Sequence, residues 1–497
     1  MGTAGKGEAF PNGGAKRTLR AQSGEQREIF RRSSSEWLSN RVAPRKTSPF
    51  VPVEESTGME GVLCVRCLVG LWGDDIMAYQ RPRGTVDLLP GETDWWENLE
   101  TVARRLFRAY HFQEIRTPAF EHTEVFVRSV GETTDIVEKE MYTFPDKKGR
   151  SMTLRPEGTA GVIRAYVENK LYANPGVSKL YYVGPMFRYE NPQAGRQRQF
   201  YQLGCEALGA DGPDIDAEII ALSVDVLHEF GLEGVSVELN SVGCPVCRAV
   251  HKERMLEALD PVRDKLCSDC SRRIDKNPLR IFDCKRGCQA VLEEVGAPTI
   301  LDSLCSDCRQ HFEGTKALLD AFEVRYEVNP LLVRGLDYYT RTAWELTYPG
   351  SGSLGGGGRY NGLVEQLDGP PTPGIGFAIG MERAILMRKS NGGEPSQKSG
   401  LDVFVAVADE AAAITAQKFV HRLRKNGIRA DKDYQGKGMK AQFKAADREH
   451  ARFVAVFGGD ELLHNTVSIK DLSTGVQQEI PEHEAIQFLT NQARQEI

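Results

Sequence analysis

The sequence predicts an α+β protein: a domain built on an antiparallel sheet, a helical cysteine-rich insertion, and a C-terminal α/β domain. Three observations carry this prediction. Residues 179–189 and 198–208 read as two strands joined by a polar turn, which implies an antiparallel hairpin. Residues 241–320 are helical, charged and rich in cysteine. Residues 401–497 alternate strand and helix, as in a sheet covered by helices.

The composition is that of a globular chain. Its 497 residues are enough for about three domains, and 40% of them are hydrophobic and 27% charged. The net charge of −6 excludes a general polyanion binder, so contact with nucleic acid would need a local basic patch. The apolar stretch Gly61–Trp72 is broken by Arg66 and is shorter than the ~20 residues of a membrane span, so we expect no membrane contact.

Residues 1–76 differ from the rest. The first fifty contain ten Lys/Arg against four Glu, with many Ser, Gly and Pro, and this pattern predicts disorder. Three explanations compete: an organelle transit segment, a basic tail, or a stretch outside the native protein, for which Met77 is a sensible start. The eleven cysteines, an odd number without a convincing secretory signal, indicate reduced thiols. We therefore expect a cytoplasmic protein, or an organellar one if the extension is a transit segment.

The first domain is expected to comprise residues 77–240 and 321–390, interrupted by the insertion. Residues 391–400 are polar and rich in Gly, Pro and Ser, which predicts a linker. The other elements expected in the first domain are a helix over Glu92–His111, a strand-like run over Glu114–Phe120, a strand over Ala343–Thr347 and an apolar helix over Ile375–Met387.

The C-terminal domain alternates regularly. The expected elements are strand Val403–Val407, helix Ala411–Lys425, strand Ile428–Ala430, helix Met439–Glu449 and strand Phe453–Phe457. Between Lys418 and Arg452 there are eleven Lys/Arg against four Asp/Glu. This excess is explained either by a solvated helix face or by a surface for a polyanion.

The hairpin places polar side chains on a sheet face. Gln202 and Glu206 share one face of the second strand because strand side chains alternate, and Arg188 lies on the partner strand, followed by Glu190. Buried polar groups are costly unless they are paired or contact a ligand. The alternatives are a structural Arg–Glu pair and a ligand site.

Two further segments carry candidate binding groups. Glu157, Gly158 and Thr159 form a tight turn whose carboxylate and hydroxyl oxygens suit an ammonium group. The alternative is that Thr159 caps the following helix. Arg334–Arg341 is dense in Arg and Tyr, and Arg offers a charged fork for phosphate. Arg383 lies within an otherwise apolar predicted helix and could likewise bind phosphate. The alternative is that its side chain extends along the helix to reach solvent.

Eight cysteines form four close pairs within the insertion. Cys244 and Cys247, then Cys267 and Cys270, have the spacing of a zinc ribbon, with nineteen residues between the pairs. The pairs Cys284/Cys288 and Cys305/Cys308 would form a second site or interleave with the first two. We expect a structural Zn²⁺ through Cys244, Cys247, Cys267 and Cys270. The alternative is reduced buried cysteines, and spacing alone does not decide which four would share a metal.

Several segments together resemble one family, histidyl-tRNA synthetase, of the class II aminoacyl-tRNA synthetases. The resemblance runs from about Met77 to the C-terminus, and Arg334–Tyr339 is its most specific element. The segments that carry it are Arg83–Pro90, Leu154–Thr159, Phe187–Glu190, Arg198–Glu206, Arg334–Thr340 and Gly374–Arg383.

The resemblance implies a catalytic domain with six or seven antiparallel strands, an anticodon-binding C-terminal domain and a homodimer. Its reaction is activation of L-histidine by ATP with Mg²⁺, followed by transfer to histidine tRNA. The implied catalytic residues are Arg188, Arg334 and Arg383; the ATP site adds Glu190; and the histidine site comprises Glu157, Gly158, Thr159, Gln202, Glu206, Tyr338 and Tyr339.

Two other functions compete with this one. The first is a synthetase-like regulatory subunit of histidine biosynthesis, a class that typically lacks the C-terminal domain and loses these arginines. The second is a zinc-dependent nucleic-acid-binding module, which would leave the arginines and tyrosines unexplained. The sequence therefore favours the histidine–tRNA ligase.

Overall fold

The computed structural model describes residues 79–131, 134–350, 352–394 and 400–494. The extension predicted over residues 1–76 lies outside the described residues, as does the middle of the predicted linker. No helix in these described ranges has the length and apolar character needed to cross a bilayer.

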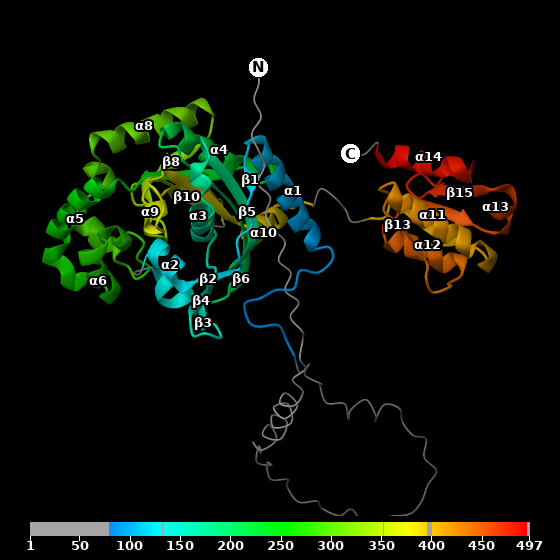
Figure 1. The fold of residues 1–497 in the computed structure, drawn as a ribbon, viewed down its shortest axis with the longest axis horizontal. Coiled ribbons are helices and arrows are strands. Elements are labelled where there is room, and N and C mark those ends of the chain that lie inside the picture. The colour runs from blue at the N-terminus through cyan, green and yellow to red at the C-terminus, as the bar shows by residue number, and fades with distance from the viewer. Residues whose placement is uncertain (1–78, 132–133, 351, 395–399, 495–497) are drawn as a thin grey trace, which may run out of the picture. The chain divides into compact units, whose positions relative to one another are not determined.

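The first domain is built on an eight-stranded sheet whose six central strands are antiparallel (Figure 1). In spatial order its strands are β1 (Gln113–Glu114), β5 (Ser178–Phe187), β6 (Gln199–Leu208), β11 (Gly374–Gly380), β10 (Gly352–Arg359), β9 (Thr340–Tyr348), β7 (Ser236–Ser241) and β8 (Tyr326–Val328). The two edge strands, β1 and β8, pair in parallel with β5 and β7. Parallel pairing needs a long crossover, and the insertion supplies one between β7 and β8. The sheet is therefore larger than the six or seven antiparallel strands implied by the resemblance.

Three helices cover one face of this sheet. They are α1 (Thr93–Ala109), α4 (Pro213–Glu229) and α10 (Met381–Ser390). The helical period predicted for residues 92–111 is that of α1, whose Leu99, Ala103 and Phe107 are buried. Phe107 stacks on Tyr181 of β5 with ring centroids 4.7 Å apart, so α1 packs directly on the sheet.

Two predicted elements of this domain were wrong. Ile375–Met387 is not one helix, because strand β11 occupies its first part and α10 begins only at Met381. Glycine alternates with large apolar residues at the start of this segment, which is a strand period. Glu114–Phe120 is not one strand either: β1 ends at Glu114 and β2 begins at Phe120, with Pro118 between them.

The opposite face carries smaller elements. They are a three-stranded sheet of β2 (Phe120–His122), β4 (Ser151–Leu154) and β3 (Tyr142–Pro145), and the helices α2 (Thr123–Val130), α3 (Thr159–Glu168) and α9 (Leu363–Gln366). Val162 of α3 packs on Tyr182 and Met186 of β5, so α3 lies on this face.

The insertion consists of helices gathered on one side of the domain, shown in green in Figure 1. Its helices are α5 (Pro245–Leu259), α6 (Ser268–Lys276), α7 (Gln289–Glu294) and α8 (Ser306–Ala321), with single turns at Asp260–Lys265, Pro278–Ile281 and Ile300–Ser303. Helix α8 packs against α4 and β9, which ties the insertion to the sheet.

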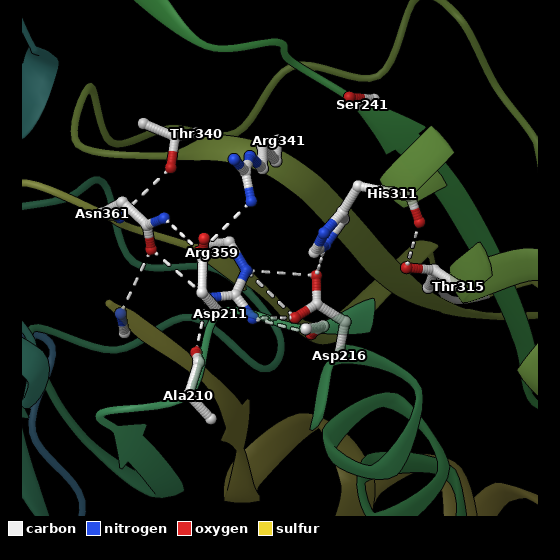
Figure 2. A network of polar contacts seen from close by, with 12 residues as sticks. Ala210, Asp211, Asp216, Ser241, His311, Thr315, Thr340, Arg341, Arg359 and Asn361 are labelled. Carbon is white, nitrogen blue, oxygen red and sulfur yellow. Dashed lines mark hydrogen bonds and ion pairs between the residues drawn. The ribbon is translucent and has the colours of Figure 1, made fainter. Parts of the chain in front are cut away.

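A buried ionic network fixes this junction (Figure 2). Arg359, at the end of β10, is fully buried and pairs with the equally buried Asp216 of α4. His311 of α8 contacts the other oxygen of Asp216 at 2.7 Å. Burial opposes the charged form of Asp216, but His311 and Arg359 outweigh it and hold its pKa below the usual value. One carboxylate therefore joins the sheet, the helical layer and the insertion.

The C-terminal domain has a five-stranded sheet with helices on it. The strand order is β13 (Ala430–Lys432), β12 (Val403–Val407), β14 (Phe453–Phe457), β15 (Thr466–Asp471) and β16 (Gln477–Pro481). The helices are α11 (Ala413–Lys425), α12 (Met439–Arg448), α13 (Gly459–His464) and α14 (Glu482–Arg494). The predicted strands at 403–407 and 453–457 coincide with β12 and β14, which pair in parallel.

Candidate active site

A cavity of about 360 Å³ opens on the sheet face opposite α1 and α4. This volume lies at the small end of the range typical of ligand sites, roughly 300–1,000 Å³. The alternation along β6 explains which side chains reach it. Tyr201, Leu203 and Cys205 point into the helical core, whereas Phe200 and Gln202 line the cavity.

Three arginines that are distant in the sequence line this one cavity: Arg188, Arg334 and Arg383. Arg188 donates from Nε to the Pro156 carbonyl at 2.8 Å, and its guanidinium lies 5.2 Å from the centre of the Phe200 ring. Arg334 pairs with Glu345 of β9 at 3.2 Å. These contacts orient the guanidiniums and leave further N–H groups for a ligand.

Arg383 lies on α10 and donates to the Ser353 carbonyl. Burial, together with the nearby positive charge of Arg196, lowers the pKa of Arg383 from its ordinary value. Glu190 also lines the cavity and pairs with Arg196 at 3.3 Å. Arg196 and Arg383 thus lie close enough to repel each other, with Glu190 offsetting part of that repulsion, and two neighbouring guanidiniums suit an anionic ligand.

The predicted turn at residues 157–159 lies against the cavity, and its cap is not the expected one. Glu157, not Thr159, caps α3: its carboxylate accepts from the backbone amides of Thr159 at 2.7 Å and Ala160 at 2.8 Å. Burial raises the pKa of Glu157. Glu157 and Thr159 both line the cavity, whereas Gly158 packs beneath them, where a Cβ would lie 2.3 Å from the Tyr182 ring.

Three buried side-chain atoms of cavity-lining residues have no hydrogen-bond partner among the described residues. They are Oε1 of Gln202, Nε of Arg334 and the hydroxyl oxygen of Tyr182. A buried polar atom without a partner is costly unless a ligand or water satisfies it. Gln202 thus offers an acceptor and Arg334 a donor to a polar ligand.

Glu206 shares the β6 face with Gln202, as predicted, but it is fully buried and does not line the cavity, unlike the other residues of the implied histidine site that face the ligand space. Its carboxylate accepts from the Thr159 hydroxyl at 2.7 Å and from the Tyr360 hydroxyl at 2.5 Å, and both of those residues do line the cavity. Burial raises the pKa of Glu206 to about 8. Glu206 therefore lies behind two hydroxyl groups that face the ligand space.

Aromatic rings form the rest of this end of the cavity. Tyr338 and Tyr339 both line it, with ring centroids 4.6 Å apart, and Tyr338 meets Tyr360 edge to face at 5.7 Å. Burial raises the pKa of each phenol, so all three hydroxyls stay protonated. These rings give the site flat apolar walls with polar tips.

The glycine run at residues 355–358 is explained by crowding in the sheet. A Cβ at Gly358 would lie 2.5 Å from the Tyr339 ring, and one at Gly376 would lie 1.9 Å from the Glu206 carboxylate. At Gly356 the φ of +155° is a backbone conformation that L side chains rarely adopt, and a Cβ would lie 3.0 Å from Cζ of Arg334. Glycine thus lets the floor of the cavity approach the functional side chains closely.

The predicted site residues leave out several that line the cavity, among them the charged Asp283, Lys285, Glu345 and Glu382 and the phenol Tyr360. Asp283 and Lys285 belong to the insertion, and no local pattern indicated that it reaches the cavity. Burial raises the pKa of Glu382 to about 7. In the sequence, the strand alternation of β9 could have indicated which face Glu345 occupies. Glu382 could have been found only because it directly precedes Arg383.

The cysteines form two clusters, grouped differently from the predicted set of four. Cys244 and Cys247 gather with Cys305 and Cys308, and in each cluster the four sulfur atoms lie within 4.8 Å of one another. The second cluster consists of Cys267, Cys270, Cys284 and Cys288. Each cluster combines two cysteine pairs that are separated in the sequence, and the spacing within the pairs did not show which pairs would combine. Either cluster could hold one metal ion.

In the C-terminal domain the basic stretch is only partly ion-paired. Arg422, Arg424 and Arg429 pair with acidic residues at 2.7–2.8 Å. Lys440 and Lys444 project from α12 and are exposed. Unpaired surface lysines suit contact with a phosphate backbone.

An antiparallel sheet whose face carries three separated arginines around one cavity, followed by an α/β domain, fits the class II aminoacyl-tRNA synthetases that the sequence resembles. The comparisons with known proteins agree. Residues 84–384 match the family described as histidyl-tRNA synthetase, and residues 402–492 match the anticodon binding domain. The chain belongs to the histidyl-tRNA synthetase family.

Curated relatives and solved structures extend this similarity over most of the chain. A histidine–tRNA ligase of Desulfitobacterium hafniense is 53% identical over 82% of this chain and 96% of its own length. One of Desulforamulus reducens is 51% identical over 83% of this chain and 99% of its own length. The crystal structure of apo S. aureus histidyl-tRNA synthetase is 41% identical, with a TM-score of 0.72 over 83% of this chain and all of that chain.

Proposed function

We propose that the cavity activates L-histidine with ATP to form histidyl-adenylate and then passes the histidyl group to histidine tRNA. The observation that carries this proposal is the meeting of Arg188, Arg334 and Arg383 around one cavity whose other end is built of hydroxyl, amide and aromatic groups. The cationic end suits a triphosphate, and the other end suits an amino acid with a polar ring.

The arginines are assigned to the phosphates. Arg188 binds the α-phosphate as the histidine carboxylate attacks it, Arg334 adds a second cation there, and Arg383 holds the γ-phosphate. Negative charge spreads over the phosphoryl oxygens in the transition state, and oriented guanidiniums stabilise that charge without having to reorganise. Pyrophosphate leaves with the electron pair of the broken P–O bond.

The amino group of histidine is assigned to Glu157, Thr159 and Gln202. The unpartnered Oε1 of Gln202 accepts one of its protons, and the oxygens of the other two residues accept the rest. In this assignment the buried Oε1 of Gln202 gains a hydrogen-bond donor.

Glu206 is assigned a positioning role in reading the imidazole. When ionised, it accepts the protons of the Thr159 and Tyr360 hydroxyls, so the lone pairs of both oxygens are left to face the ligand. Two acceptors oriented in this way favour a ligand with N–H groups, while Tyr338 and Tyr339 form the flat walls of the ring site. An apolar amino acid would leave these groups unpaired and is rejected.

ATP enters with Mg²⁺, which neutralises phosphate charge when bound. The carboxylates of Glu190, Glu345 and Glu382 line the same cavity, so the oxygen ligands that Mg²⁺ prefers are present. Glu190 is assigned to the ATP site on this ground.

The remaining partners are assigned to surfaces outside the cavity. The exposed lysines of α12 contact phosphates of the tRNA. A second copy of the chain pairs through the region of α1 and Phe120, where Phe120 and Phe144 are half-exposed and 6.2 Å apart. A cytoplasmic location is proposed on the ground of reduced cysteines.

Histidine-dependent exchange of pyrophosphate into ATP tests the activation step, and charging of histidine tRNA tests the transfer. We expect both activities, with histidine alone among the amino acids supporting exchange. Absence of both would favour the regulatory-subunit alternative. Sedimentation or light scattering tests the dimer, for which a monomeric mass at micromolar concentration is the contrary result.

A further inference from the structure

We propose that each tetracysteine cluster binds one Zn²⁺, and that the two ions hold the insertion against the segment that carries Arg334, Tyr338 and Tyr339. Metal binding does not depend on the proposed function, whereas the effect on the active site rests on it.

The sulfur geometry fits tetrahedral zinc. Zinc–thiolate bonds of about 2.3 Å place the corners of a tetrahedron about 3.8 Å apart. Cys244 lies 3.5 Å from Cys247 and 4.0 Å from Cys305 in the first cluster, sulfur to sulfur. In the second, the sulfurs of Cys267 and Cys284 are 3.8 Å apart. A disulfide would need about 2.0 Å, and these cysteines are free.

The backbone around the sulfurs also suits thiolates. The amide of Cys305 donates to the sulfur of Cys247 at 3.2 Å, and the amide of Cys267 donates to that of Cys288 at 3.3 Å. Amide donors of this kind stabilise and orient metal-bound sulfur. With four thiolates in each site and no position left open, both sites are of the structural type.

The second cluster is continuous with the active-site wall. Its Cys284 lies directly between Asp283 and Lys285, which both line the cavity. Just before it, Arg280 donates to Asp337 at 3.0 Å and Asn277 donates to the same carboxylate at 3.1 Å. Asp337 immediately precedes Tyr338 in the chain. An ion in this cluster therefore fixes one wall of the cavity and one end of the tyrosine pair.

The first cluster holds the two ends of the same segment. Val333, next to Arg334, packs in the apolar group that surrounds this cluster. At the other end, the Arg341 amide donates to the Gly243 carbonyl at 3.0 Å, and the Val242 amide donates to Arg341 at 2.7 Å. Arg341 also reaches Asp211 in the buried network of Arg359 (Figure 2). This cluster thus anchors the segment where it enters and leaves the active site.

Metal analysis of the purified full-length protein tests the first half of the proposal. We expect two zinc ions per chain, falling to one in the double variant Cys267→Ser/Cys270→Ser and to one in Cys305→Ser/Cys308→Ser. The matched control is Cys205→Ala, a buried cysteine outside both clusters, which should keep two. Iron in place of zinc, or fewer than two zinc ions in the unaltered protein, would overturn the proposal.

A second measurement avoids dependence on variants that fail to fold. Titration of the native protein with a mercurial should release two zinc ions as the eight clustered thiols react, and Co²⁺ put in place of zinc should give the visible bands of tetrahedral thiolate coordination. Thiols that react without releasing any metal would contradict the assignment.

The effect on the active site is tested by rescue. Cys288→Ser should lose one zinc ion and lower histidine-dependent exchange by about tenfold or more, since small displacements of binding groups cost that much. Cys288→His, which keeps a zinc ligand, should restore both metal and exchange. Exchange unaffected by zinc loss refutes the positioning role, whereas no exchange in the unaltered zinc-loaded protein refutes the proposed function instead.

Discussion

Replacing Glu206 by glutamine should change how histidine affinity depends on pH. Glu206 is fully buried behind Thr159 and Tyr360, and burial raises its pKa to about 8. In the proposed role, its ionised form turns both hydroxyls into acceptors. Histidine binding therefore requires the carboxylate, and affinity should rise as the pH approaches and passes 8.

The expected magnitude follows from that pKa. At pH 7 about one carboxyl in ten is ionised, and at pH 8 about half are, so the affinity for histidine should rise about fivefold over this interval. Ionising the group at pH 7 costs about 1.4 kcal/mol, which the ligand must supply. The Glu206→Gln variant should bind histidine more weakly and lose this part of the pH dependence.

Calorimetric titration of histidine at pH 6.5 to 8.5, without ATP, measures both effects. Glu382, whose pKa burial raises to about 7, titrates in the same range but remains in the variant, so the difference between the two proteins isolates Glu206. A Glu206→Gln profile parallel to that of the unaltered protein would refute the reasoning.

The same pKa has a consequence for stability with the opposite sign. The folded-state pKa lies above the ordinary 4.5, so folding favours the protonated carboxyl. This contribution is fully present below pH 4.5 and is lost as the pH rises through 8. Thermal unfolding should therefore show Glu206→Gln gaining stability relative to the unaltered protein as the pH rises from 4.5 to about 8, and a constant difference over this range would contradict the pKa.

Three other variants test separate parts of the molecule. Arg334→Ala should lower the activation rate by about 10²–10³, as loss of one transition-state donor does, while Arg325→Ala, at an exposed arginine outside the cavity, should not; pyrophosphate exchange by Arg334→Ala within twofold of the unaltered rate would reject the role. Asp216→Asn should destabilise the protein by about 3–5 kcal/mol in urea unfolding, because it removes the buried partner of an arginine, and a loss below 1 kcal/mol would argue against the network. Lys440→Glu with Lys444→Glu should weaken tRNA charging and flatten its salt dependence while leaving exchange unchanged; an unaltered salt slope would place the tRNA elsewhere.

Much of the fold was readable from local patterns. The helical period of α1 and the alternation of β5 and β6 depend on neighbours along the chain, and the structure has these elements near the predicted positions. The segment from Ile375 was misread because its apolar character was taken as helical, although glycine alternating with large apolar residues is a strand period. The crowding of the sheet, in which a Cβ at Gly376 would collide with Glu206, explains why glycine occupies that position.

The site was less readable, since it depends on contacts between distant segments. The motifs supplied Arg188, Arg334 and Arg383, and all three line one cavity. The depth of Glu206 beneath Tyr360 did not follow from strand alternation, because alternation gives the face of a residue and not what covers it. The approach of Asp283 to the cavity depends on how the cysteine pairs combine, and spacing left that combination open.

The free cavity holds its arginines against carboxylates that ATP can replace. Arg334 pairs with Glu345 at 3.2 Å and Arg196 with Glu190 at 3.3 Å, and all four side chains line the cavity. Partly buried guanidiniums need such partners, because an unpaired buried charge is costly. In the proposed function, phosphates bound to Arg334 would leave the Glu345 carboxylate beside them, and Mg²⁺ takes oxygen ligands of this kind. Glu345→Gln should therefore raise the Mg²⁺ concentration needed for half-maximal exchange more than it raises the KM for histidine.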